Sequence, residues 1–171
     1  MMGANYKFAY EKARQVLKKY KITEVPTDLQ AICKGLGVEY VELNDPEALD
    51  GALLEMNGMH VAMLNRAKSF VRGRFTLAHE LGHICLEHGK RDFYDPEMAR
   101  ELGEDVPENK KPAKEQEADA FASELLMPTD QLKKYQGELK NLDKMAELFQ
   151  VSKQAMSIAI NRYYSSARNF K

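Results

Sequence analysis

In the N-terminal part of the chain, apolar and polar positions first follow a helical period. Between residues 6 and 20 the apolar side chains recur every three or four positions, with lysines and arginines between them, which predicts an amphipathic helix. A second helix is predicted over Leu29–Gly35, because Thr27-Asp28 can cap its start and Gly35 and Gly37 can end it.

The pattern then becomes strand-like. Residues 38–43 mix β-branched and aromatic side chains with polar ones and predict a strand. Gly51–Met56 and His60–Asn65 are split by Asn57-Gly58, a pair typical of tight turns, and predict a hairpin. A sheet of about three strands is too small to be stable without helices packed on it.

Helical spacing returns over Arg72–His88 and again over Ala113–Met127, where Pro128 ends the pattern. The intervening residues are rich in charge, proline and glycine and predict a long loop, with a helical turn around residues 97–102. Two further helices are predicted, over Leu142–Phe149 and Lys153–Tyr164. Since no linker stands out, we expect residues 1–171 to form one α+β domain with a helical C-terminal subregion over residues 140–168.

This C-terminal subregion has the spacing of a helix-turn-helix. Ala146 falls at the helix contact, Val151-Ser152 at the turn and Met156 between the helices, although Gln150 stands where glycine is usual. A DNA-reading helix should carry a basic, polar face, whereas the second helix here is mostly small and apolar. The pattern therefore favours a helix pair packed on the rest of the domain over direct nucleic-acid binding.

Composition narrows the class of protein. Hydrophobic residues make up 44% and charged residues 30% of the chain, which is ordinary for a globular domain, and the formal net charge of −1 gives no attraction to nucleic acid or acidic membranes. No stretch approaches the roughly 18 apolar residues of a membrane span. With two cysteines and no apolar leader, we expect free thiols and a cytoplasmic location.

The chemistry is concentrated in His79-Glu80-Leu81-Gly82-His83, an H-E-x-x-H motif within a predicted helix. Residues four apart on a helix are separated by about 40° in projection, so both imidazoles can converge on one cation, and zinc favours such ligands. Glu80 lies beside His79 on the same face and is suited to accept a proton from the attacking water. Apolar flanking residues indicate a core helix, where unpaired histidines would be costly.

A third ligand is expected from the helix at residues 113–127. There Glu115 and Asp119 share a face with small residues, so this helix can approach Gly82 closely, whereas Glu117 points about 200° away from Glu115. We select Glu115 as the third metal ligand and Asp119 as the carboxylate that orients a ligand histidine. Glu117 is kept as the alternative metal ligand.

Two segments together resemble the ImmA/IrrE metallopeptidases: Arg74–His83, and Glu115–Pro128 with its Phe-Ala and terminal Leu-Leu-Met-Pro. Further similarity upstream, at Pro26, residues 36–38 and Asp50-Gly51, extends the resemblance from about Val25 to about Arg162.

The resemblance implies a zincin-like, thermolysin-like core and a zinc-dependent endopeptidase. By position, His79, His83 and Glu115 match the family's ligands to one zinc ion, and Glu80 matches its catalytic acid. Family members cleave helix-turn-helix repressors in bacteria or on mobile elements, so the implied partner is a protein substrate of that kind. Two other functions stay open: a nucleic-acid-binding regulator with a structural metal site, and a silent protein-binding component of a toxin–antitoxin pair.

A zinc peptidase also needs a positive or donor group that stabilises the oxyanion. The sequence offers several residues of suitable chemistry without selecting one: His60, Arg72, Arg74, His88, Arg162 and Tyr163.

Overall fold

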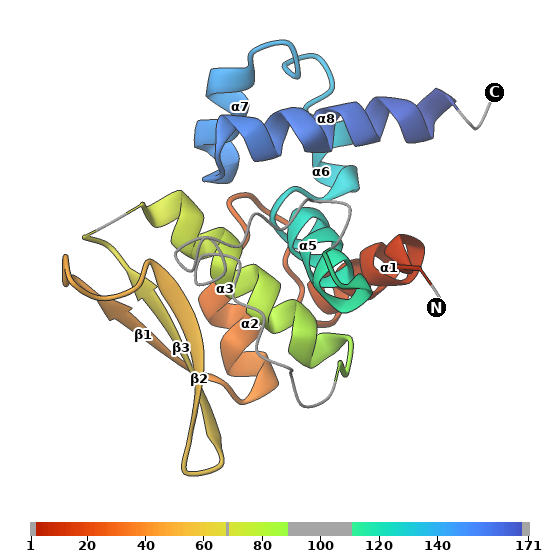
Figure 1. The fold of residues 1–171 in the computed structure, drawn as a ribbon. Coiled ribbons are helices and arrows are strands. Elements are labelled where there is room, and N and C mark those ends of the chain that lie inside the picture. Colours follow the sequence, from red (N-terminus) through yellow and green to blue (C-terminus); the bar gives the residue numbers. More distant parts are fainter. Residues whose placement is uncertain (1–2, 68, 89–110, 169–171) are drawn as a thin grey trace.

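The computed structural model describes residues 3–67, 69–88 and 111–168 and has an α+β fold (Figure 1). Its helices are α1 (Tyr6–Lys19), α2 (Leu29–Leu36), α3 (Phe70–Cys85), α5 (Ala113–Leu126), α6 (Thr129–Lys134), α7 (Leu142–Phe149) and α8 (Lys153–Arg168). Its strands are β1 (Glu39–Leu43), β2 (Gly51–Met56) and β3 (Met59–Asn65). The helical turn predicted around residues 97–102 lies outside the described residues.

The three strands form a mixed sheet in the order β1-β3-β2. Strand β2 pairs antiparallel with β3 across the predicted Asn57-Gly58 turn, where both residues have positive φ, at 53° and 77°. Strand β1 pairs with β3 in parallel. One face of β3 carries Ala62 and Leu64, which are almost fully buried, because helix α3 packs on β2 and β3.

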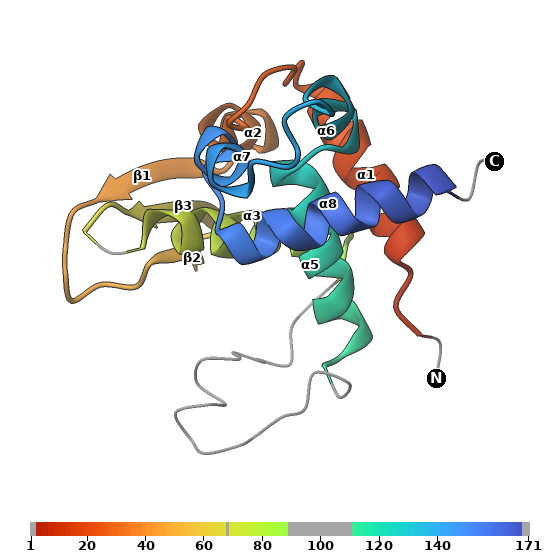
Figure 2. The ribbon, with the colours of Figure 1, turned by 90° about the horizontal axis from the view of Figure 1, so that it is seen from above.

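Helix α5 lies between α1 and α3 in both views of the ribbon (Figures 1 and 2). Small residues make this arrangement close: Ala9 and Ala13 of α1 and Ala118 and Ala122 of α5 are fully buried. Larger apolar side chains from α3 and α5, including Leu77, Leu81, Phe121 and Leu125, complete the core at 0% exposure. The sheet covers the other side of α3.

The contact between α3 and α5 is close at Gly82. A Cβ atom at this position would lie 3.1 Å from Phe121 Cδ1 and 3.3 Å from the Ala118 backbone. The space beside Gly82 that the sequence predicted for a neighbouring helix is therefore occupied by α5, and a side chain at this position would push Phe121 and the α5 backbone away.

Helix α3 ends three residues earlier than the predicted end at His88. Glu87 has a left-handed backbone, with φ of 56°, and the His88 N–H donates to the His83 carbonyl at 3.2 Å while the Glu87 N–H donates to Ile84. This pair of bonds is the Schellman ending of a helix, usually built with glycine at the left-handed position. The sequence has glutamate at this position and gives no signal for a helix end. The periodicity therefore predicted an end three residues too late.

The C-terminal helices α7 and α8 enclose the turn expected from the helix-turn-helix spacing. Gln150 takes the left-handed conformation normally supplied by glycine, with φ of 53°, and Ala146, Val151 and Met156 are buried. Helix α6, which sequence periodicity missed, begins directly after Pro128 and is only six residues long.

The C-terminal helices are tied to the core through Glu124 of α5, which is 1% exposed. Its carboxylate pairs with Arg14 of α1 and with Arg162 of α8, both at 2.9 Å, and accepts a hydrogen bond from Thr129.

Cys33 and Cys85 are buried free thiols, as predicted. Across the described residues, none of the helices combines the length and apolar character that crossing a bilayer requires.

Replacing Gly82 with valine should destabilise the fold by about 1–3 kcal/mol, because α3 and α5 must separate to accommodate the side chain. Urea unfolding of the metal-free protein measures this change. The matched control is Gly137→Val, since an added Cβ at Gly137 meets no atom within 4 Å. Equal destabilisation by the two substitutions would contradict the close helix contact.

Candidate metal centre

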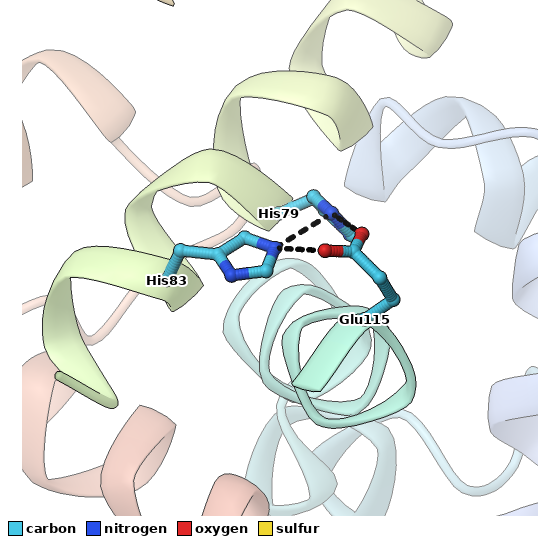
Figure 3. A group of neighbouring side chains, drawn as sticks. All are labelled: His79, His83 and Glu115. Carbon is cyan, nitrogen blue, oxygen red and sulfur yellow. Dashed lines mark hydrogen bonds and ion pairs between the residues drawn. The ribbon is translucent and has the colours of Figure 1, made fainter. Parts of the chain in front are cut away.

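Two helices bring His79, His83 and Glu115 together. The histidines project from α3, one turn apart, and Glu115 projects from the first turn of α5 toward both rings (Figure 3). His79 Nε2 lies 3.1 Å from His83 Nε2 and 3.1 Å from Glu115 Oε2, and His83 Nε2 lies 3.3 Å from Glu115 Oε1. The structure thus joins the three residues that sequence reasoning selected as ligands.

These distances suit a tetrahedrally coordinated ion. Ligand atoms about 2.0–2.1 Å from zinc are about 3.3 Å from one another when the angles are tetrahedral. The ligating atoms of His79, His83 and Glu115 all lie within 4.8 Å of one another, and the side chains are 13%, 7% and 9% exposed. The group can therefore hold one small divalent cation.

The protonation of His79 makes the need for a cation clear. Its Nδ1 lies 2.8 Å from Asp119 Oδ1, and a carboxylate only accepts hydrogen bonds, so the ring proton is on Nδ1. The Nε2 lone pair then faces the Glu115 carboxylate and His83 Nε2. Lone pairs that face one another in a buried site repel unless a proton or a metal ion lies between them.

Asp119 occupies the place expected of a carboxylate that orients a ligand. Besides His79, it contacts Lys111 Nζ through its other oxygen. Lys111 was missed by sequence reasoning, because the segment before α5 has no period that would indicate where a lysine points. The lysine balances the charge of Asp119 and holds the carboxylate in position.

Glu117, the alternative ligand, lies elsewhere. Its Oε2 is 3.0 Å from His88 Nε2, and it is not part of the group formed by His79, His83 and Glu115. His88 in turn contacts His83 from the side opposite Glu115, through two Nδ1 atoms 2.9 Å apart. Sequence reasoning considered both residues but in other roles.

The pKa values follow from this geometry. Burial lowers the pKa of His79, but its hydrogen bonds to Asp119 and Glu115 have a larger combined effect and raise the pKa to about 8. Burial also raises the pKa values of Glu115 and Asp119, and hydrogen bonds with histidine outweigh it, so both carboxyls titrate below their usual range. Without metal, a proton on His79 therefore takes the place of the cation.

Glu80 lies on α3 beside His79 and is partly buried. Three of the six residues considered for the oxyanion are engaged elsewhere. Arg74 donates to the Thr27 carbonyl at 2.8 Å, and Arg162 binds Glu124 and Ser123. Arg72 pairs with Asp50 at 3.2 Å.

The remaining oxyanion candidates are His60, Tyr163 and His88. His60 is exposed on β3, Tyr163 lies against Tyr164, and His88 lies behind His83.

Comparison with known proteins agrees with this site. The Peptidase_M78 family, described as the IrrE N-terminal-like domain, matches residues 33–161, which is most of the chain and includes every residue of the candidate centre. The chain belongs to this family. It therefore carries an M78 metallopeptidase domain, and His79, His83 and Glu115 form its candidate metal site. The resemblance to ImmA/IrrE proteins inferred from the sequence is confirmed.

Among solved structures, a Mycobacterium tuberculosis transcriptional regulator has a similar fold, with a TM-score of 0.61 and 13% sequence identity. The match covers 87% of this chain and 54% of that protein, so this chain spans about half of its length. At this identity the likeness concerns the fold alone. No curated protein has a significant sequence match to the chain.

The raised pKa of His79 makes the stability of the metal-free protein depend on pH. The pKa of His79 is about 8 in the folded state and near 6.5 in the unfolded state, so the folded state binds the proton more tightly. Protonation should therefore add about 2 kcal/mol to the free energy of unfolding. This contribution is fully present below about pH 6.5 and is lost as the pH rises through about 8. Denaturant unfolding in chelator at several pH values measures it.

His79→Ala should remove this part of the pH dependence, whereas His60→Ala should keep it, since His60 is exposed on β3. Identical pH profiles for wild type and His79→Ala would show that the pKa of His79 is not raised.

Proposed function

We propose that this protein is a zinc-dependent endopeptidase. The observation that carries the proposal is the convergence of His79 Nε2, His83 Nε2 and the Glu115 carboxylate at 3.1–3.3 Å, next to Glu80, in a chain of the M78 family. Three protein ligands are typical of catalytic zinc, which keeps a further coordination position for water or substrate.

Each residue has a distinct role in this proposal. His79, His83 and Glu115 would hold the zinc ion, and Asp119 keeps the His79 ring in the tautomer that leaves Nε2 available. A bound zinc ion lowers the pKa of water toward about 7 and polarises a peptide carbonyl. Glu80 accepts the proton as water attacks the scissile carbonyl, and it then returns the proton to the leaving amine nitrogen.

We further propose that the substrate is a helix-turn-helix transcriptional repressor, which the protein cleaves at a specific site. The M78 domain by itself implies a protein substrate. The resemblance to the ImmA/IrrE proteins, whose members cleave such repressors, supports a repressor in particular. Family members of this kind work in the cytoplasm of bacteria, where such repressors are found.

One observation favours a second candidate, a regulator that binds nucleic acid or protein with a silent metal site. Helices α7 and α8 flank a tight turn with the spacing of a helix-turn-helix. The charges around that turn argue against nucleic acid: Lys153 at the start of α8 is paired with Asp143 at 2.8 Å, and Glu147 of α7 adds a further negative charge. The peptidase proposal therefore has the stronger support.

The Glu80→Gln substitution tests the enzyme directly. It should slow cleavage of the repressor by at least about a hundredfold, because the general base is lost, while zinc affinity stays unchanged since Glu80 is not a ligand. The substrates to use are purified helix-turn-helix repressors, with products identified by mass spectrometry. Glu115→Gln should instead lower zinc affinity itself.

Glu11→Gln is the matched control, because Glu11 lies on α1 with a side chain 51% exposed. Cleavage that survives both Glu80→Gln and a chelator would exclude metal-dependent proteolysis. Salt-dependent DNA binding without any cleavage would favour the second candidate.

A further inference from the structure

Helix α3 ends at Cys85, and the chain then folds back so that His88 lies against the last turn of the helix. Because Glu87 adopts a left-handed backbone, the chain reverses and the His88 N–H bonds to the carbonyl of His83. The two rings then meet edge to face, with centroids 4.9 Å apart. Left-handed non-glycine residues are strained and persist where the surrounding contacts require them, often at functional sites. Here that conformation places His88 directly behind a metal-ligand candidate.

A continuous chain of hydrogen bonds runs outward from His83. His83 Nδ1 lies 2.9 Å from His88 Nδ1, and His88 Nε2 lies 3.0 Å from Glu117 Oε2. The other oxygen of Glu117 accepts from the backbone N–H of Asn5 at 2.7 Å. We call His83, His88, Glu117 and the Asn5 N–H the His88 relay. Lys114 fixes the relay further by donating to the His88 carbonyl at 2.5 Å.

Only one arrangement of protons satisfies every contact in the relay with neutral rings. Glu117 accepts from both neighbours, so His88 must carry its proton on Nε2, which leaves His88 Nδ1 as an acceptor. His83 must then carry its proton on Nδ1 and donate to His88. The lone pair of His83 is consequently on Nε2, the atom that faces His79 and Glu115.

We propose that His88 and Glu117 are positioning residues that fix the tautomer and ring orientation of His83 for metal binding. Asp119 performs the same task for His79 through a direct carboxylate contact. The two ligand histidines are thus held differently, one by a carboxylate and one by a neutral imidazole backed by a carboxylate. Since the relay ends at Asn5, the residue that caps α1, the start of α1 also supports the metal centre.

The relay rests on the metal centre of the proposed function but not on the identity of the substrate. Binding of Co²⁺ to the full chain provides a readout other than activity, because the visible absorption of cobalt reports both affinity and ligand geometry. His88→Ala should weaken Co²⁺ binding by about 10–100-fold and shift the absorption bands, the usual consequence of losing a group that orients a ligand. Glu117→Ala should act in the same direction.

Two further variants separate a positioning role from a general structural one. His88→Asn should restore most of the affinity, because the asparagine Oδ1 is as many bonds from Cα as the histidine Nδ1 and can accept from His83. His60→Ala should bind Co²⁺ as the wild type does, since His60 is exposed on β3. Loss of stability in His88→Ala without change in the Co²⁺ spectrum would overturn the proposal.

Nitrogen-15 NMR of the zinc-loaded wild type gives a direct test that needs no variant, so it holds even if His88→Ala fails to fold. The chain has only 4 histidines, which simplifies assignment. We expect His83 protonated on Nδ1 and His88 protonated on Nε2. A proton on Nδ1 of His88 would overturn the relay while leaving the peptidase proposal intact. Failure of the wild type to bind either metal would refute both.

Discussion

The candidate metal site brings together lone pairs of two imidazoles and one carboxylate, which would repel one another without a cation between them. His79 Nε2, His83 Nε2 and the Glu115 carboxylate are directed at one point in a largely buried site, and the outer nitrogens of both rings are already engaged. In the metal-free protein, burial lowers the pKa of His79, but hydrogen bonds to Asp119 and Glu115 outweigh burial and raise it to about 8, so a proton can take the place of the cation. A divalent cation bound by His79, His83 and Glu115 would relieve this repulsion as well.

Bringing these groups together requires two helices in unusually close contact. Gly82 and Ala118 let the backbones of α3 and α5 approach, so that Glu115 reaches the rings from the start of α5. Helix α1 supports α5 from the other side, and Glu124 links α5 to α1 and α8 by charged hydrogen bonds. The packing that stabilises the fold is therefore also the packing that sets the distances of the metal centre.

The hydrogen-bonding partners of the two histidines give the centre an asymmetric frame. Asp119, contacted by Lys111, is a charged acceptor next to His79, while His83 meets a neutral ring and the charge of Glu117 lies one residue further out. Orienting groups of this type usually change metal affinity by about 10–100-fold. Because the chain of hydrogen bonds from His83 ends at Asn5, the centre is supported by residues of α3 and α5, by the residue that caps α1, and by His88 just after the end of α3.

The sequence by itself determined what depends on local spacing. Helical and strand periods located most elements to within a few residues, and the four-residue spacing of His79 and His83, with Glu115 and Asp119 on one face of a second helix, outlined the centre. Only the tertiary structure decided the parallel pairing of β1 with β3, the end of α3, and the contacts of His88, Glu117 and Lys111. Some of these features join residues far apart in the chain. Others depend on the left-handed backbone at Glu87, which a glutamate side chain does not indicate. Periodicity reports which face a residue occupies, whereas packing determines the partner it meets there.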